Sequence, residues 1–443
     1  MTEGEKGIPE RLAPVAAAER IAAVDVVRGL ALLGILIINI DFFALPDTVY
    51  FDPSSAGDLT GLNLLTWQVA MTLFEYKMMA LFSMLFGAGL ILMHSRAEAI
   101  GRRFAGIYYR RVFWLLMFGL AHAYLLWMGD ILYAYAMCGL ILYPLRRRSP
   151  RFLLNLGIVL LLLGSLIKLG TGYSFELLRD ANDRVQSKLE AGEAITARDE
   201  ALVAQWEEVR TGFKASPEAV QRQVEAYRGG FKEVFQVRAP QSFVMQTQLF
   251  LFMVLWRVGG LMLIGMALMK LGVFSGQRSR RFYVWLMVVG FGLGLPLAYL
   301  GMSRWLASDF DFVQLFQVNS HFNYFGSILA ALGYVGLIIT IYNRGWLTWL
   351  TARLAAVGRT ALSNYLLQSI ICTTIFYGYG LGLYARVDRF ALQWFVLAVW
   401  IVQLIVSPIW LARFRFGPAE WLWRSLTYWK RQPMKTVIAS HEG

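Results

Sequence analysis

Residues 22–45, which read AAVDVVRGLALLGILIINIDFFAL, give the clearest indication of the fold. The run is long enough to cross a membrane, because a hydrocarbon core about 30 Å thick needs about 20 apolar residues in a helix. Its ionisable residues lie near the ends: Asp25 and Arg28 at the start and Asp41 at the exit. The stretch therefore predicts a transmembrane helix with polar groups gathered near both faces of the bilayer.

The composition of the whole chain agrees with this interpretation. The 443 residues are 57% hydrophobic and 16% charged, and the mean hydropathy is +0.51. Soluble globular proteins carry about 25% charged residues, so a soluble enzyme and a disordered chain are excluded. Lys and Arg (42) exceed Asp and Glu (29), for a net charge of +13. In a membrane protein this excess indicates basic cytoplasmic loops, not nucleic-acid binding.

Further apolar runs extend the prediction to an all-α, polytopic transmembrane helix bundle of about ten spans. The run at 131–145 is short for a span. The ten runs lie near residues 22–45, 72–94, 107–128, 131–145, 152–173, 245–269, 282–303, 321–342, 360–384 and 391–412. Within the second run, Gly87 and Gly89 indicate close helix packing. At its start, Glu75 and Lys77 are expected to form a pair at the membrane interface.

The distribution of Lys and Arg predicts the orientation of the spans. If the spans alternate, the loops rich in Lys and Arg all fall on one side, whereas residues 46–61 on the other side contain none. Because cytoplasmic loops carry the basic excess, both termini are expected in the cytoplasm. This places an N-terminal segment, 1–20, and a C-terminal tail, 413–443, on the cytoplasmic side.

A polar segment, residues 174–240, separates the spans of residues 21–173 from those of residues 241–412. It holds 12 acidic and 10 basic residues, and long loops are translocated regardless of their charge. Ser216 followed by Pro217 is typical of a helix start, and apolar residues then recur at helical spacing from Val220 to Phe235. We predict a small extracytoplasmic helical insert, whose apolar stripe either packs on the membrane domain or lies on the lipid surface.

Polar residues near the outer ends of the spans are candidate catalytic groups, because ionisable side chains are costly in hydrocarbon. They are Asn39, Asp41, His122 and Asp130. A histidine beside a carboxylate can act as a general base, and Asp130 follows His122 across a tight outer turn. The sequence predicts that the four residues line an outward-facing polar cavity. The alternative is a core imidazole with one partner and carboxylates exposed at the interface.

Arg28, Arg359 and Asn364 lie near the inner ends of their spans and are candidate cofactor-binding residues. Arg28 follows Asp25 by three residues, so the two share a helix face and can pair. Arginines on the cytoplasmic side suit a phosphate-rich ligand or a lipid headgroup. The alternative is the basic belt common to all cytoplasmic loops. No metal site is expected, because the two cysteines, Cys138 and Cys372, lack metal-ligand spacing.

Five motifs resemble the YeiB-like bacterial inner-membrane family, and the resemblance runs from Arg20 to Tyr428. It implies a helical protein of the bacterial inner membrane, whose C-terminal half is a domain of unknown function. The motifs are AVDVVRGLALLGILIINI, EYKMMALFSMLFGAGL, HAYLLWMGDILYAYA, GRTALSNYLLQSIICTTIFY and RFRFGPAEWLWRSLTY.

The N-terminal part is more distantly similar to the transmembrane acyltransferases that include heparan-alpha-glucosaminide N-acetyltransferase. The shared features are the D-x-x-R-G start of the first span and its terminal Asn39. The resemblance implies an acyl-coenzyme A donor in the cytosol and an acceptor on the far side. The catalytic histidine of that group corresponds in position to Tyr50, and this chain has no histidine between Asn39 and His94. His122 is the candidate to take its place.

The sequence leaves three functions open. In a transmembrane acyltransferase, Arg28 and Arg359 would hold the donor phosphates, His122 would be the base oriented by Asp130 or Asp41, and Asn39 would stabilise the oxyanion. In a transporter or lipid-handling protein without catalytic activity, the two polar sets would be the ends of a substrate path. In a structural protein, a partner would dock on the insert. Membrane lipids and a small-molecule or lipid substrate are the expected partners, and nucleic acid is not.

Overall fold

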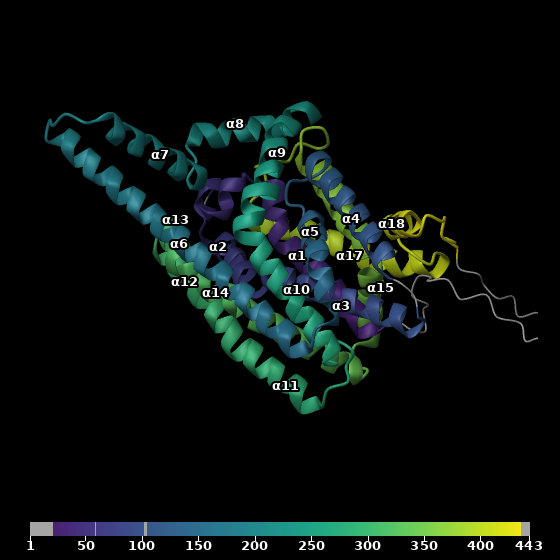
Figure 1. Ribbon diagram of the computed structural model, residues 1–443. Coiled ribbons are helices and arrows are strands. Elements are labelled where there is room, and N and C mark those ends of the chain that lie inside the picture. The colour runs from purple at the N-terminus through teal and green to yellow at the C-terminus, as the bar shows by residue number, and fades with distance from the viewer. Residues whose placement is uncertain (1–20, 58, 102–103, 436–443) are drawn as a thin grey trace, which may run out of the picture.

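The computed structural model describes residues 21–57, 59–101 and 104–435, and within them the chain is an all-α bundle without a β-strand (Figure 1). The prediction of the fold class is therefore confirmed. Short 3₁₀ and π segments join several of the helices. The α-helices are α1 (Ala22–Ala44), α2 (Gly61–Val69), α3 (Lys77–Ala99), α4 (Ala105–Leu125), α5 (Leu132–Leu142), α6 (Pro150–Glu190), α7 (Ala197–Phe213), α8 (Pro217–Arg228), α9 (Phe231–Val244), α10 (Leu255–Lys270), α11 (Arg280–Val289), α12 (Leu295–Ala307), α13 (Phe312–Gln314), α14 (Ser320–Asn343), α15 (Thr348–Arg359), α16 (Ala361–Phe376), α17 (Arg389–Arg413) and α18 (Pro418–Tyr428).

Seven helical runs in the described chain are long and apolar enough to cross a membrane. They are Ala22–Ala44, Gly61–Ala99, Pro150–Glu190, Phe231–Lys270, Arg280–Ala307, Phe312–Asn343 and Arg389–Arg413. The other three expected spans correspond to α4, α5 and α16, of which α5 has 11 residues and α16 has 16. Helix α16 ends at Phe376, before the expected limit at 384, because glycines at 378, 380 and 382 turn the chain.

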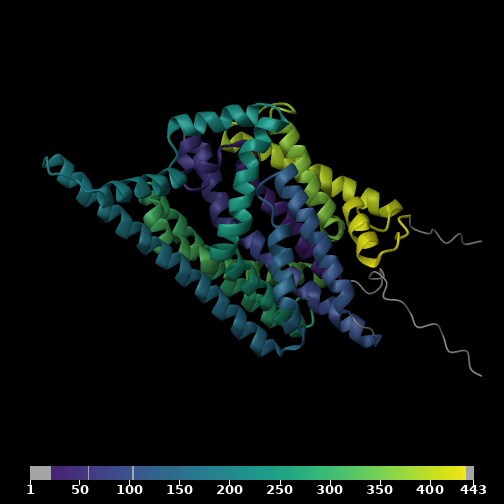
Figure 2. The ribbon, with the colours of Figure 1, turned by 45° about the horizontal axis from the view of Figure 1, so that its top comes forward.

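The loops rich in Lys and Arg meet at one end of the bundle. Lys270 Nζ donates to the Arg148 carbonyl oxygen at 2.8 Å, which joins the loops after α10 and α5. The indole Nε1 of Trp423 in α18 donates to the Arg111 carbonyl oxygen at 2.8 Å, near the start of α4. We call this the arginine-rich end. The opposite end, where α1 and α4 finish and α8 lies, is the insert end (Figure 2).

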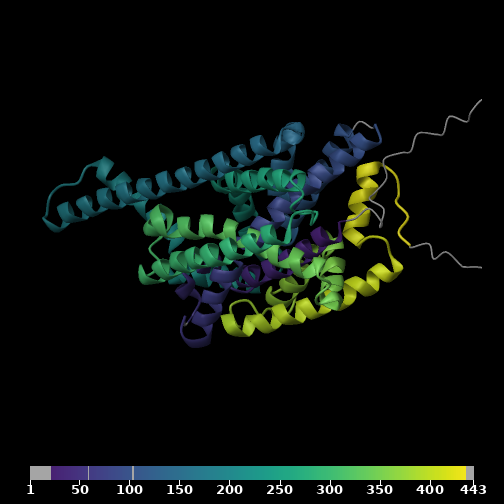
Figure 3. The ribbon, with the colours of Figure 1, turned by 90° about the horizontal axis from the view of Figure 1, so that it is seen from below.

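The polar segment at 174–240 does not start as a separate unit. Helix α6 runs unbroken to Glu190 and projects beyond the bundle, and α7 folds back beside it (Figure 1 and Figure 3). The predicted helix start at Ser216 is confirmed, because its Oγ accepts from the Ala219 backbone N–H at 3.2 Å. The apolar residues that recur at helical spacing over 220–235 are divided between two helices, because Gly229 and Gly230 separate α8 from α9.

Helix α8 packs on the membrane domain and does not lie free on a lipid surface. Arg228 Nε donates to the Tyr384 carbonyl oxygen at 2.8 Å, and Gly378 N–H donates to the Tyr227 carbonyl oxygen at 2.8 Å. The Tyr227 and Tyr384 rings stack with their centroids 4.6 Å apart. Val224 and Tyr227 are both buried. Of the two alternatives predicted from the sequence, the structure therefore shows packing on the membrane domain.

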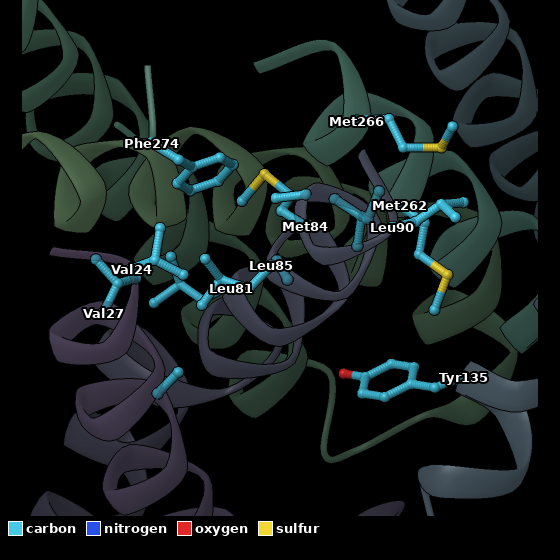
Figure 4. Packing of buried hydrophobic residues seen from close by; sticks show 14 of the residues in the cluster. Val24, Val27, Leu81, Met84, Leu85, Leu90, Tyr135, Met262, Met266 and Phe274 are labelled. Carbon is cyan, nitrogen blue, oxygen red and sulfur yellow. The ribbon is translucent and has the colours of Figure 1, made fainter. Parts of the chain in front are cut away.

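Apolar side chains of α1, α3 and α10 form the centre of the bundle (Figure 4). Two glycines let α3 and α10 approach closely: a Cβ on Gly87 would lie 2.0 Å from the Met262 carbonyl oxygen, and one on Gly265 would lie 1.9 Å from that of Met84. The predicted packing role is therefore confirmed for Gly87. It is wrong for Gly89, where a Cβ would meet nothing within 4 Å.

Gly87→Ala is expected to lower the free energy of unfolding by about 1–3 kcal/mol or more, because the added methyl would collide with backbone. Gly89→Ala is the matched control and should change it by less than about 0.5 kcal/mol. Thermal melting of both variants in one detergent would measure the difference. If both variants lose the same free energy of unfolding, the close contact between α3 and α10 is not the cause of the destabilisation.

Candidate functional site

His122 lies at the centre of a buried chain of hydrogen bonds formed by three side chains. Its Nδ1 is 2.9 Å from Asp130 Oδ1, and its Nε2 is 2.8 Å from Ser369 Oγ. The His122 and Asp130 side chains are 0% and 1% exposed. The expected contact between His122 and Asp130 is therefore present. The contact of His122 with Ser369, which lies far along the chain on α16, was not predicted from the sequence.

The local chain explains why Asp130 meets His122. After α4 ends, the backbone N–H groups of Leu126 and Trp127 both donate to the His122 carbonyl oxygen, which turns the chain back. Asp130 Oδ2 then accepts from the Tyr133 N–H at 2.7 Å, which fixes the carboxylate at the start of α5. A Cβ on Gly119 would lie 2.5 Å from the Tyr133 nitrogen, so a glycine is needed there for α4 and α5 to pack.

The three groups stand in the order hydroxyl, imidazole, carboxylate. An ionised carboxylate only accepts, so Asp130 selects the tautomer with the proton on Nδ1. Nε2 is then the basic nitrogen, and the Ser369 hydroxyl donates to it. This is the arrangement of a nucleophile, its general base and an orienting acid, which is recognised by geometry and not by sequence order.

The other two outer candidates do not join this group. Asp41 Oδ2 accepts from Arg389 Nε at 2.8 Å, which ties α1 to the start of α17. Asn39 is half-buried and forms no hydrogen bond with His122, Asp130 or Asp41 within the described chain. The structure thus brings together His122 and Asp130, whereas the expected grouping of all four residues is not seen.

A cavity of about 570 Å³ opens at the arginine-rich end among α1, α3, α4, α5, α15, α16 and α18. Among the described residues, five arginines line it, together with the carboxylates of Asp25 and Glu420. The arginines are Arg28, Arg96, Arg111, Arg359 and Arg424. Apolar and aromatic side chains form the rest of the wall, and Gly89, which has no packing partner, contributes to it. The volume and the mixed lining are typical of a small-molecule site.

Two of the three inner candidates line this cavity. Arg28 NH1 donates to Asp25 Oδ1 at 2.7 Å, as its spacing predicts, and Arg359 lies on the same cavity wall. The buried Nε of Arg359 has no hydrogen-bond partner among the described residues. Asn364 does not line the cavity: its Nδ2 donates to Ser407 Oγ at 2.9 Å and joins α16 to α17. Its position therefore gives no support to a cofactor-binding role.

Tyr365 connects the cavity with the His122 group. Its side chain lines the cavity, and its ring centroid is 4.9 Å from that of His122. Its hydroxyl donates to the Gly129 carbonyl oxygen at 3.3 Å, next to Asp130. Ile131, the following residue, also lines the cavity. The part of the cavity wall formed by Tyr365 and Ile131 therefore lies against the buried chain of hydrogen bonds.

The chain is similar over almost its whole length to bacterial proteins without an assigned function. It is 34% identical over 422 residues to the uncharacterized protein YeiB of Escherichia coli (strain K12), covering 92% of this chain and 96% of the relative. The chain belongs to the YeiB-like family. The uncharacterized protein YxaH of Bacillus subtilis (strain 168) is 30% identical over 444 residues, which is 96% of this chain and 98% of that protein.

A family described as a protein of unknown function (DUF418) matches residues 268–430 of this YeiB-like chain. The matched region contains Arg359, Ser369 and Glu420, whereas His122 and Asp130 precede it. The candidate site thus combines both halves of the chain. No solved structure gave a significant match.

The YeiB-like bundle holds a second buried polar cluster, among α3, α10 and α14. Lys77 Nζ donates to Asn323 Oδ1 at 2.7 Å, and Asn323 Nδ2 donates to Glu75 Oε2. Arg257 NH2 donates to Ser327 Oγ at 2.7 Å close by. The expectation of an interfacial pair is wrong here, because Lys77 is 0% exposed and Glu75 is 5% exposed.

Two further residues of this YeiB-like protein, Ser369 and Arg389, were not predicted from the sequence, and neither was the capping role of Glu420. Glu420 caps α16: its Oε1 accepts from the Leu362 N–H at 2.6 Å, where a helix start favours negative charge. Burial raises the pKa of Glu420, and its hydrogen bonds from Ser363 oppose that shift. Ser369 belongs to no nucleophile motif, and only the need to satisfy a buried imidazole could have indicated a partner. Arg389 could likewise have been sought as the counter-charge of Asp41.

Proposed function

We propose that this protein is a transmembrane acyltransferase. It would take an acyl group from a donor bound in the arginine-lined cavity and pass it to an acceptor arriving from the insert end. The observation that carries the proposal is the hydrogen-bonded chain Asp130–His122–Ser369. It lies against the part of the cavity wall that Tyr365 forms. A general base next to a substrate-sized cavity is what acyl transfer requires.

The cavity chemistry supports acyl-coenzyme A as the donor. Arginines bind phosphates through several N–H groups in a fixed plane, so Arg28 and Arg359 suit the phosphates of this donor. Burial lowers the pKa of Arg424 below its usual range, so a bound anion would offset the cost of keeping it charged. The apolar wall near Tyr365 suits the acyl end, which would place the thioester close to His122.

Two arginine substitutions test donor binding. Arg28→Gln and Arg359→Gln should each raise the KM for acetyl-coenzyme A by about ten- to a hundredfold, because each removes a charge-assisted hydrogen bond of about 1.5–3 kcal/mol. The readout is the release of free coenzyme A thiol by the protein in lipid nanodiscs. Arg353→Gln is the control, because Arg353 is on the same helix, α15, and does not line the cavity. Equal KM values for all three variants would contradict the proposed donor site.

We infer that the arginine-rich end faces the cytoplasm of a bacterium, with both termini there and the protein in the inner membrane. The gathering of basic loops at one end supports this orientation. A cysteine placed at Glu200 should react with a membrane-impermeant thiol reagent applied to whole cells, whereas one placed at Arg147 should not. Both native cysteines are buried, so the background should be low. If only the cysteine at Arg147 is labelled, the arginine-rich end faces the outside of the cell. A cytosolic donor could then not reach the cavity.

The buried cluster around Glu75 and Lys77 favours transport as the second candidate function. Charged groups held inside membrane spans are typical of ion and proton paths. Proteoliposomes loaded with a pH-sensitive dye would separate the two functions. Dissipation of a pH gradient by the wild type, lost in a folded Glu75→Gln/Lys77→Met variant, would favour transport. A gradient retained by the wild type would exclude a proton path.

A further inference from the structure

The basic nitrogen of His122 is directed at a hydroxyl group of the protein itself. Nδ1 is engaged by Asp130, which leaves Nε2 as the proton acceptor, and Nε2 contacts Ser369 Oγ at 2.8 Å. Ser369 is 1% exposed and His122 is also 1% exposed. In this state the hydroxyl that Nε2 contacts is that of Ser369, so Ser369 is the group that the base is placed to deprotonate.

The contacts of Ser369 distinguish this from an ordinary helical serine. Buried serines in helices commonly donate to the carbonyl oxygen four residues earlier. Here the distance from Ser369 Oγ to the Tyr365 carbonyl oxygen is 3.4 Å, longer than the 2.8 Å to His122. The shorter contact leads to the imidazole, which is the contact that activates a hydroxyl as a nucleophile.

We infer that Ser369 is the nucleophile and carries the acyl group between donor and acceptor as a serine ester. This inference rests on the proposed acyltransferase function and adds its covalent intermediate. In the first step the Ser369 hydroxyl proton passes to His122 Nε2 while Oγ attacks the thioester carbonyl carbon. The carbon–sulfur bond breaks, and the proton on His122 passes to the leaving thiolate. The products are the acyl-Ser369 ester and free coenzyme A.

In the second step the ester transfers its acyl group to an amine or hydroxyl acceptor. The acceptor gives its proton to His122 and attacks the ester carbonyl carbon, and the bond to Ser369 Oγ breaks. The Ser369 oxygen then recovers the proton from His122. Ser369 and His122 return to their starting protonation states. Neither step needs an oxidant, a reductant or a further co-reactant.

Ser369 lies between the donor cavity and the insert end, and this position explains why an ester intermediate would be useful. On one side, Tyr365 joins the His122 group to the donor cavity. On the other side, α9 covers the end of α4: Ser242 Oγ donates to the Ala123 carbonyl oxygen and Arg238 NH1 donates to the Leu126 carbonyl oxygen, each at 2.9 Å. In the proposed function the acceptor arrives from this insert end, which α9 covers in the structure, and the donor from the opposite end. A covalent carrier between them lets the acyl group cross without both substrates bound at once.

The test is to trap the ester in the absence of acceptor. The purified protein in nanodiscs is incubated with radiolabelled acetyl-coenzyme A, and in parallel with radiolabelled palmitoyl-coenzyme A, then quenched and mapped by mass spectrometry. We expect label on the peptide that holds Ser369, removable by alkaline hydroxylamine, and a burst of about one free thiol per protein. Ser369→Ala should give no labelled protein. Thr373→Ala, which removes another buried hydroxyl of α16, should label like the wild type.

The Ser369→Cys variant keeps a nucleophile at this position, so it tests the inference even if the alanine variant does not fold. Its cysteine should form a thioester that hydroxylamine removes at neutral pH. If Ser369→Ala melts like the wild type and still releases thiol at the wild-type rate, the inference is overturned and single-step transfer by the proposed enzyme remains. Label on His122 would overturn it in the same way. If the wild type takes no label and releases no thiol in the absence of acceptor, the ester intermediate is overturned. If it also releases no thiol from either donor when a primary amine is supplied as acceptor, the proposed function itself fails.

Discussion

His122→Ala is expected to lose acyl transfer by about a hundred- to ten-thousandfold, which is the usual contribution of a positioned general base. The substitution removes the only group that contacts both Asp130 and Ser369 in the hydrogen-bonded chain. In the proposed mechanism, the Ser369 proton would then have no acceptor, and the leaving thiolate would have no proton donor. Asp130→Asn should give a smaller loss, because it disturbs the tautomer of His122 while leaving the imidazole in place.

The rate of coenzyme A thiol release in nanodiscs measures this effect. His321→Ala is the control, because His321 is also held by two hydrogen bonds, to Ser165 Oγ and the Phe316 carbonyl oxygen, and does not line the arginine-lined cavity. It should keep the wild-type rate. In cells, a deletion strain carrying His122→Ala should match the deletion strain in its lipid and metabolite profile. A His122→Ala protein that melts normally and keeps full activity would contradict the mechanism.

Lys77→Met is expected to lower the free energy of unfolding by about 3–5 kcal/mol, the usual cost of removing one partner of a buried charge pair. Lys77 Nζ donates to Asn323 Oδ1 at 2.7 Å and to the Met71 carbonyl oxygen at 2.9 Å. The substitution leaves both oxygens without that donor and removes a counter-charge from buried Glu75. The methionine side chain nearly matches the volume of lysine, so the loss would come from polarity and not from a void.

The double variant Glu75→Gln/Lys77→Met provides the matched control. It removes both charges together, so it should be less destabilised than Lys77→Met alone. Thermal or denaturant unfolding of Lys77→Met, Glu75→Gln and the double variant in one detergent gives the comparison. A double variant that loses as much as the two single variants combined would show that charge pairing does not hold these side chains in place.

The sequence by itself was sufficient for the fold class and for the local part of the site. The apolar stretch at 22–45 predicts α1 within one residue at each end, because the free energy of placing a helix in a bilayer depends on the residues of that helix alone. The contact between His122 and Asp130 was also predictable, because eight residues and one turn separate them. The helix start at Ser216 followed in the same way from neighbouring residues.

Only the tertiary structure decided which distant residues meet. Ser369 is 247 positions from His122, and Arg389 is 348 positions from Asp41. Such contacts depend on how each helix is rotated and which helix lies beside it, and close approach at glycines sets both. A Cβ on Gly358 would lie 1.9 Å from the Asp25 carbonyl oxygen, and one on Gly29 would lie 2.0 Å from that of Leu354. Glycines on both helices thus let α15 pack closely on α1, where Arg28 and Arg359 line one cavity. Hydrophobicity is a property of each segment, whereas the active geometry depends on the complementary shapes of segments far apart in the chain.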